Sequence, residues 1–576
     1  MRNRASILRW AITVVFAVIF GRLFVVQVID HDEYVAEAEK QQTMQNVIVA
    51  RRGEIYMMDD GKAVPVVMNQ KVWSVIIDPK IANDSKDEIW KTLGELAADK
   101  IVAKQEDAFK NPDSRYYVIA RNVDYDTAAK IKEKNLRGLW MQENNKRVYP
   151  EGQMASGLLG FVNADGVGQY GVEGALDDDL NGENGVRKTV KDVNNIPLTV
   201  GDKNVLVPAV NGKNIVLTVD RNIQNAAEKA VQSAIDELHA KHASALVMNP
   251  QTGEVLAMAN MPNYDPENYG NVEDAAIYQT NATMDAFEPA SVCKTFAMAA
   301  AINENKMTPD TQFNNTYCIT IDGWPICNSV NWQNGIQTMQ TALDYSLNIG
   351  STQALKFLGD DANTITYQGK TRLYDYYYNH FGLGQYTGIE LMESKGIIIA
   401  PEEVDGTDAR YANMTFGQGL NVTMIQVASG YASIVNGGEY YTPTVVAGEV
   451  NDAGEFLQLD IEEPKRETIR PETSTTMRKM LHHARSLFAD AEQYDHGAYV
   501  GGKTGTSQSY DANGAYTSDV TSATYIGFGA KTENDIPQYL IMTRVWGDGQ
   551  KFDGGAHAKP IFDKISNFML NYLRMR

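Results

Sequence analysis

Cysteine, histidine and tryptophan are scarce, since the 576 residues include 3 Cys, 8 His and 7 Trp. Three cysteines are too few for a small scaffold held together by disulfides, and their spacing contains no C-x-x-C pair or other zinc pattern. The histidines form no H-E-x-x-H motif. The sequence therefore gives no indication of a metal site.

Basic residues are also in deficit. Lys and Arg number 52 against 73 Asp and Glu, which gives a net charge of −21 and a pI near 4.9. Because nucleic-acid phosphates require a basic surface, this balance argues against a nucleic-acid-binding protein. The apolar fraction of 43% and the charged fraction of 22% are typical of folded protein. The length suggests about three or four domains.

One long apolar run covers residues 10–29. It has about the length needed to cross a bilayer as a helix, and Arg22 near its outer end can extend its charge to the interface. Arg2, Arg4 and Arg9 precede the run. By the positive-inside rule we expect a single-pass anchor in the cell membrane, with a cytoplasmic N-terminus and an extracytoplasmic remainder.

Two alternatives to an uncleaved anchor have less support. Residues 36–38, Ala-Glu-Ala, have the composition of a signal-peptide cleavage site, but the charged residues 31–33 separate them from the apolar run. The other alternative is a buried core helix.

The rest of the chain divides into two parts. Short strand-like runs and charged helical stretches alternate up to residue 211, and residues 207–212 have the composition of a boundary. A strand, a helix and an antiparallel pair follow, which indicates an α+β fold. We therefore expect an anchor (1–30), a mixed α/β domain (31–211) and an α+β domain (212–576). Expected strands cover 72–77, 116–120, 215–219, 243–248 and 254–259, and expected helices cover 87–103, 222–239 and 297–302.

The first chemically suggestive motif is S-x-x-K at Ser291 and Lys294. Pro289 suits the first turn of a helix, which would place both side chains on one face. An amine there can take the proton of the hydroxyl and make it a nucleophile, provided that burial or a nearby cation lowers the pKa of the lysine. The pattern alone is weak, because roughly one or two chance matches are expected in a chain of this length.

Two further motifs follow in the chain. Ser346-Leu347-Asn348 carries a hydroxyl that can relay a proton and a carboxamide that can hold a substrate amide. Residues 503–506, Lys-Thr-Gly-Thr, lie in a strand-like stretch where the glycine allows close backbone approach. The ordered set is far rarer by chance than any one motif. We predict that Ser291 Oγ, Lys294 Nζ, Ser346 Oγ and Lys503 Nζ lie within a few ångströms of one another.

The three motifs resemble those of class B penicillin-binding proteins. Further blocks that resemble the family lie at 21–28, 52–56, 160–182, 416–426 and 436–438. The chain departs from the family pattern at Ala290, where Gly is usual, and at 56–61, which replace a D-R-N-G block. The resemblance implies an extended pedestal domain at 31–211 and, at 212–576, a transpeptidase domain with an antiparallel sheet flanked by helices.

The resemblance also implies a reaction. Ser291, activated by Lys294, would attack the penultimate D-alanine of a peptidoglycan stem peptide, and an amine of a second stem peptide would resolve the acyl-enzyme. Ser346 would return the proton to the leaving D-alanine, and β-lactams would acylate Ser291. No metal or organic cofactor is implied. The implied catalytic residues are Ser291, Lys294 and Ser346, and the implied substrate-binding residues are Asn348, Lys503, Thr504, Gly505 and Thr506.

Partners and alternatives follow from the same resemblance. No E-D-x-x-F-like motif precedes residue 212, so glycan polymerisation would come from a partner, a multispanning glycosyltransferase, beside division proteins. Residues 77–80, 160–161 and 172–173 look more like the septal than the elongation type. The alternatives are a carboxypeptidase or β-lactamase-like hydrolase and a non-catalytic divisome scaffold or β-lactam sensor.

The remaining motif joins two of the cysteines. Asp322-Gly323 is a strong signal for a two-residue hairpin loop, which would place Cys318 opposite Cys327. Counted outward from this loop, the two cysteines form a non-hydrogen-bonded pair of the antiparallel ladder. At such a pair the Cα atoms approach to about 4.5 Å, which is within the range of a disulfide. We expect a disulfide there and a free thiol at Cys293. A reduced pair, or a longer loop in another register, is the alternative.

Overall fold

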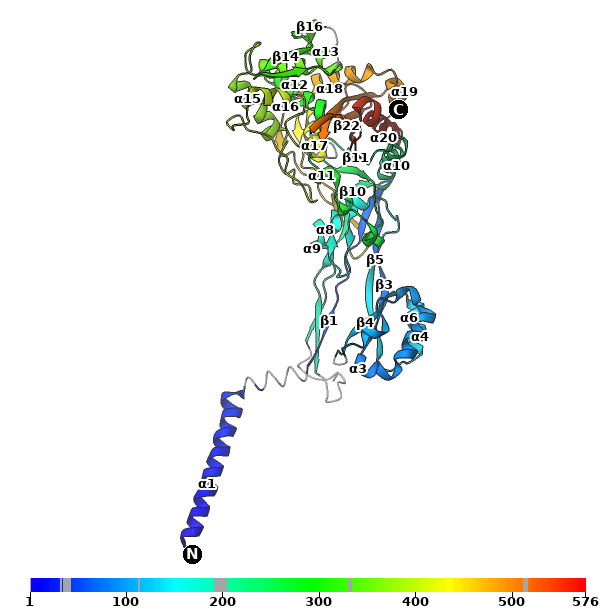
Figure 1. Ribbon diagram of the computed structural model, residues 1–576, viewed down its shortest axis with the longest axis vertical. Helices are drawn as coiled ribbons and strands as arrows, with labels where there is room; N and C mark the ends of the chain where they lie inside the picture. Colours follow the sequence, from blue (N-terminus) through cyan, green and yellow to red (C-terminus); the bar gives the residue numbers. More distant parts are fainter. Residues whose placement is uncertain are drawn as a thin grey trace. The chain divides into compact units, whose positions relative to one another are not determined.

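The computed structural model describes residues 2–31, 34, 43–111, 114–190, 205–329, 334–510, 516–547 and 549–575. Figure 1 shows the elements in chain order. The chain forms two compact units, residues 1–53 with 181–212 and residues 54–180 with 213–576. This division does not test the domain boundaries expected after residues 30 and 211, which stay a prediction.

The first unit contains the apolar helix. α1 (Arg2–Phe24) continues into a π-helical turn, η1 (Val25–Ile29), and residues 6–29 are long and apolar enough to cross a membrane. None of this span is buried in the protein, whereas a core helix would bury its side chains. The unit also holds an antiparallel sheet in the order β1 (Thr43–Ile48), β8 (Gly185–Val190), β9 (Val205–Val207).

A seven-stranded sheet in the second unit combines four strands from residues 55–148 with three strands from residues 214–458. Its order is β19-β18-β10-β2-β3-β4, with β5 also paired to β3, and β2 and β10 are parallel. Helices α4 (Lys86–Leu96) and α6 (Tyr125–Glu133) share a core with β3 and β4. The strands are β2 (Ile55–Asp59), β3 (Lys62–Ile77), β4 (Tyr117–Val123), β5 (Leu139–Val148), β10 (Asn214–Asp220), β18 (Val446–Val450) and β19 (Phe456–Gln458).

The helix expected over 87–103 is wrong at its C-terminal end. α4 ends at Leu96 because Ala97 leaves the helical region with φ −150°, and a 3-10 turn (Ala98–Lys100) follows. The strand expected over 72–77 is the last part of a longer strand that begins at Lys62, and the helix expected over 297–302 begins at Cys293. The other expected strands and helices are present with shifts of one to three residues at their ends.

The second sheet has five antiparallel strands in the order β12-β11-β23-β22-β21. Side chains alternate between two buried faces, so Ala245 and Val247 pack with α10 (Arg221–Leu238) and α20 (Lys559–Tyr572), while Leu246 and Met248 join the core of α12, α17 and α18. Figure 1 shows α10 and α20 together beside this sheet. The strands are β11 (His242–Met248), β12 (Val255–Met261), β21 (Tyr499–Tyr510), β22 (Tyr516–Ala530) and β23 (Tyr539–Trp546), and the helices are α12 (Cys293–Asn303), α17 (Met424–Val435) and α18 (Pro471–Ser486).

An antiparallel sheet flanked by helices confirms the α+β expectation for the part of the chain after residue 211. The remaining elements are α3 (Pro79–Ala82), α5 (Gln105–Ala108), α7 (Ser156–Leu159), α8 (Gly171–Ala175), α9 (Asp177–Asn181), α11 (Asn281–Met284), α13 (Met339–Asp344), α14 (Asn348–Leu358), α15 (Tyr367–Tyr374), α16 (Asp408–Met414), α19 (Ala491–Asp495), β6 (Phe161–Val162), β7 (Gly168–Gln169), β13 (Gln312–Asn315), β14 (Cys318–Ile321), β15 (Trp324–Cys327), β16 (Gly335–Thr338), β17 (Glu439–Tyr440) and β20 (Arg466–Glu467).

The cysteine hairpin has the expected register. Cys318 pairs with Cys327 across β14 and β15, and the two sulfurs form a disulfide with a Cα–Cα distance of 4.1 Å. Asp322 and Gly323 have φ values of 52° and 82°, as a two-residue turn with two left-handed residues requires. Cys293 is free and buried. The disulfide prediction is confirmed.

Candidate active site

Lys294 lies in the first turn of α12, and Ser291 lies in the short turn just before this helix. The short 3-10 turn η6 (Ala290–Val292) leads into the helix, and its Ala290 has φ 56°, in the region that favours glycine. Lys294 is fully buried, and its Nζ lies 2.8 Å from Ser291 Oγ. The amine is therefore placed to take the proton of the hydroxyl.

Ser346, between α13 and α14, and Asn348, the first residue of α14, approach the same amine. Lys294 Nζ donates to Ser346 Oγ at 3.0 Å and to Asn348 Oδ1 at 2.7 Å. Ser346 has φ 57°, a backbone conformation that a non-glycine residue adopts at some energetic cost. Asn348 Nδ2 donates to the carbonyl of Cys327 at 2.8 Å, so the disulfide hairpin orients this carboxamide.

Lys503 reaches the site from β21. Its Nζ donates to Ser346 Oγ at 3.0 Å, so this hydroxyl lies between the two lysines. The predicted convergence of Ser291, Lys294, Ser346 and Lys503 is confirmed. Gly505 makes it possible, because a Cβ at that position would lie 2.8 Å from the carbonyl of Pro289, just before Ser291.

The two lysines have perturbed acid–base properties. Burial, followed by the positive charge of Lys503, holds the pKa of Lys294 well below its ordinary value. Burial also lowers the pKa of Lys503 to about 7, although Asp344 and Asp553 oppose this shift. In the described part of the chain, neither lysine forms an ion pair with a carboxylate. An amine in this setting can be neutral near pH 7 and act as a base, as the sequence predicts for Lys294.

The hydroxyls beyond Lys503 face different partners. Lys503 Nζ donates to Thr504 Oγ1 at 3.3 Å. The exposed Thr506 donates its hydroxyl proton to Asp553 Oδ2 at 3.3 Å and accepts from the backbone N–H of Gly554 at 3.0 Å. Thr506 is thus tied to the loop after β23.

Sequence reasoning missed two acidic residues of the site. Asp344 ends α13, is nearly buried and lies 3.0 Å from His483 Nδ1, and its charge favours protonated Lys503. Asp553 begins the loop that contacts Thr506. In the sequence, this loop is indicated only by the Gly-Gly pair at 554–555. A Cβ on Gly554 would lie 2.4 Å from the carbonyl of Gly505, so the close approach of the loop to β21 requires glycine there.

Among the residues that the structure describes, no group of three or more His, Cys, Asp or Glu side chains could hold a metal ion.

Comparison with family models gives two matches. Residues 243–567 match the penicillin-binding protein transpeptidase domain, and residues 47–217 match the penicillin-binding protein dimerisation domain. Stage V sporulation protein D of Bacillus subtilis is 30% identical over 96% of this chain and 83% of its own length. Peptidoglycan D,D-transpeptidase FtsI of Escherichia coli is 27% identical over 99% of this chain and 92% of its own length.

Solved structures share the fold. A peptidoglycan synthetase from Bifidobacterium adolescentis superposes with a TM-score of 0.70 at 21% identity, covering 92% of this chain and 97% of that one. Penicillin-binding protein 3 of Mycobacterium tuberculosis, solved with aztreonam, gives a TM-score of 0.66 at 24% identity over the same shares of the two chains. With the two domain matches and relatives that span nearly its whole length, this chain belongs to the class B penicillin-binding proteins.

Proposed function

We propose that the chain is a membrane-anchored serine D,D-transpeptidase that forms its acyl-enzyme on Ser291. The observation that carries this proposal is the contact between Ser291 Oγ and a buried lysine amine that has no carboxylate partner in the described residues. A serine needs such a base, and a lysine serves as one only when its pKa is lowered. The D,D-transpeptidase activity agrees with the relatives named peptidoglycan D,D-transpeptidase.

The first step is acylation. Lys294 Nζ takes the proton of Ser291 Oγ, which attacks the carbonyl of the penultimate D-alanine and leaves a tetrahedral oxyanion. The backbone N–H groups of Ser291 and Thr506 are the donors proposed for this oxygen. Each donor of this kind typically contributes about 3 kcal/mol to the transition state.

The departure of D-alanine needs a proton, and Ser346 is placed to supply it. Its Oγ contacts both amines, so a proton can pass from Lys294 through Ser346 to the leaving nitrogen. Asn348 orients the substrate amide, held by its bond to Cys327. Lys503, Thr504, Gly505 and Thr506 bind the terminal carboxylate and the extended peptide along β21, as β-augmentation allows.

The second step transfers the acyl group to an amine of another stem peptide. In a hydrolase, water would take the place of that amine. β-Lactams, as mimics of D-Ala-D-Ala, stop at the first step with Ser291 acylated. A non-catalytic scaffold would not need the complete arrangement of serine, base and carboxylate-binding strand.

The cellular setting is proposed on the same grounds. The apolar helix anchors the protein in the membrane with a cytoplasmic N-terminus, and the catalytic domain lies outside. Residues 77–80, 160–161 and 172–173 support a role in septal synthesis. The proposed partners are a multispanning glycosyltransferase and division proteins.

Labelling with fluorescent penicillin tests the proposed nucleophile. The full-length protein in detergent is expected to be labelled, Ser291→Ala is expected to lose the label, and the control Ser486→Ala, on the exposed side of α18, is expected to keep it. Labelled Ser291→Ala would refute the assignment. Exchange of D-alanine for an added D-amino acid on a stem-peptide substrate then separates transfer from hydrolysis.

A further inference from the structure

Asp553 holds a fixed carboxylate beside the proposed peptide-binding strand. It precedes the π-helical turn η8 (Gly554–Ala558), and its Oδ1 accepts from the backbone N–H groups of Gly555 and Ala556, both at 2.9 Å. Its Oδ2 accepts only the 3.3 Å bond from Thr506 among the described residues. The residue is exposed, so one oxygen is anchored and the other faces solvent beside β21.

The carboxylate of Asp553 has no ion-pair partner in the described part of the chain, although its charge favours the protonated form of Lys503. The backbone N–H of Asp553 donates to Nδ1 of the nearby His557 at 2.7 Å. This ring nitrogen therefore carries a lone pair and no proton toward Asp553. An unpaired carboxylate at this position is a ready binding partner for a cation.

The direction of the bound peptide follows from the proposed function, on which this inference rests. A donor peptide with its terminal carboxylate at Lys503 and Thr504 runs along β21 at about 3.3 Å per residue. The penultimate carbonyl lies at the N–H of Thr506, so the residue before D-Ala-D-Ala lies about one residue beyond Thr506, whose hydroxyl is bonded to Asp553. Cross-linking requires an amine on the acceptor stem peptide. Because the donor is a stem peptide of the same polymer, the donor carries such an amine as well.

We propose that Asp553 is a specificity-determining residue that binds an ammonium group on the donor stem peptide, on the residue preceding D-Ala-D-Ala. The geometry gives this residue the only unpaired carboxylate in contact with the K-T-G strand among the residues described. A peptide with an anionic group at that position is repelled by the same charge.

Three penicillins with one skeleton test this inference, because their side chain takes the place of the upstream peptide. Ampicillin carries an ammonium group there, benzylpenicillin is neutral and carbenicillin carries a carboxylate. The measurement is the second-order rate constant for acylation of the full-length protein, expressed relative to benzylpenicillin. Asp553→Asn, which keeps an oxygen for the backbone N–H groups, is expected to lower the ampicillin ratio and raise the carbenicillin ratio by about threefold each, as a solvent-exposed ion pair allows.

The controls separate this inference from the proposed function. Asp452→Asn, in the exposed turn between β18 and β19, is expected to leave both ratios unchanged, and Asp553→Glu is expected to keep the wild-type order. Ratios that do not move in Asp553→Asn overturn the inference. If that variant does not react, the salt dependence of the wild-type ratios decides. Raising the salt from about 0.01 M to about 1 M must lower the ampicillin ratio and raise the carbenicillin ratio, and ratios that do not change with salt overturn the inference. Failure of benzylpenicillin to acylate the wild type at all would instead refute the proposed function.

Discussion

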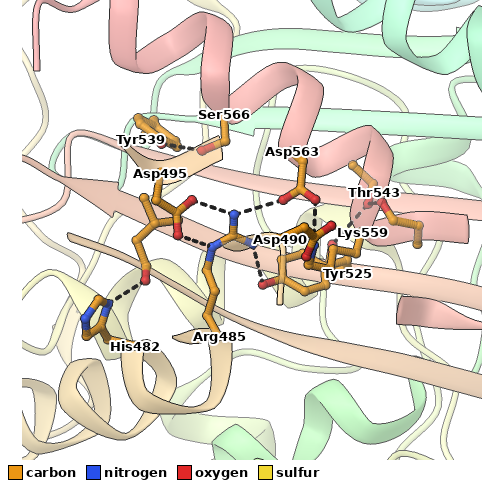
Figure 2. A network of polar contacts seen from close by, with 12 residues as sticks. His482, Arg485, Asp490, Asp495, Tyr525, Tyr539, Thr543, Lys559, Asp563 and Ser566 are labelled. Atoms are coloured by element: carbon orange, nitrogen blue, oxygen red, sulfur yellow. Dashed lines mark hydrogen bonds and ion pairs between the residues drawn. The ribbon is translucent and has the colours of Figure 1, made fainter. Parts of the chain in front are cut away.

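Replacement of Arg485 by Met tests the buried charge cluster behind the catalytic strand. Arg485, on α18, is fully buried and binds both oxygens of Asp495, at 2.7 and 2.5 Å, together with Asp563 at 2.9 Å. It also donates to the hydroxyl of Tyr525 at 3.1 Å, and Tyr525 lies opposite Thr504 in the β21–β22 ladder. Figure 2 shows Arg485 between the two carboxylates, with Lys559 bonded to Asp563 on the far side.

The size of the effect follows from what the substitution leaves behind. Asp563 keeps Lys559 at 2.7 Å, but the buried Asp495 loses its only ion-pair partner among the described residues. Removing one partner of a buried pair costs about 3–5 kcal/mol. With about 2.1 cal/mol/K of unfolding entropy per residue over the matched transpeptidase domain (243–567), the melting temperature should fall by about 4–7 °C.

Thermal unfolding of the purified protein measures this change. Lys479→Met is the matched control on the same helix, because its exposed pair with Glu533 should contribute less than about 1 kcal/mol. Burial raises the pKa of Asp495, and Arg485 opposes this. Without Arg485 the pKa of the buried Asp495 should rise further, so its carboxyl is charged more often at pH 8 than at pH 5. Because the unpaired buried charge is what destabilises the fold, the fall in melting temperature should be larger at pH 8 than at pH 5. Adding Asp495→Asn should recover at least half of the loss.

A melting temperature of Arg485→Met equal to that of the control, or no recovery in the double variant, would refute the reasoning. The first result would mean that the cluster contributes nothing net. The second would mean that the cost arises from lost packing of the arginine and not from the stranded carboxylate.

Four further outcomes are expected. Lys294→Met should slow acylation by penicillin at least about 100-fold with an unchanged circular dichroism spectrum, as loss of a general base implies, and near-normal labelling would exclude this base. Because the pKa of Lys503 is lowered to about 7, its cation is lost as the pH rises through 7, so acylation at low penicillin concentration should fall above that pH and Lys503→Arg should abolish the fall. Replacing Cys318 and Cys327 by Ser should remove about 2–3 kcal/mol of local stability, seen as faster hydrogen exchange of the hairpin amides but not of β21. Ala290→Gly should raise stability by up to about 1 kcal/mol in thermal unfolding, since φ is 56° there, and a lower melting temperature would show that the methyl group contributes more than the strain costs.

Much of the candidate site could be predicted from the sequence because its chemistry is carried by short motifs. Ser291 and Lys294 are fixed relative to each other by one helical turn, and the family resemblance supplies the connection to Ser346 and Lys503. The disulfide hairpin could be predicted because Asp322-Gly323 sets the register locally.

The parts that could not be predicted depend on contacts between distant segments. Asp344 and Asp553 reach the site from a helix end and a loop that carry no recognisable pattern, and only the packed structure places them beside Lys503 and Thr506. The cluster around Arg485 is of the same kind, since its partners come from α19, β22 and α20. The end of α4 at Leu96 was missed because no Gly or Pro follows it.

Mass spectrometry of the intact protein after reaction with benzylpenicillin, followed by peptide mapping, tests the central claim most directly. The account predicts one covalent adduct, located on the peptide that contains Ser291 and absent from Ser291→Ala. No adduct, or an adduct on another residue, would contradict it.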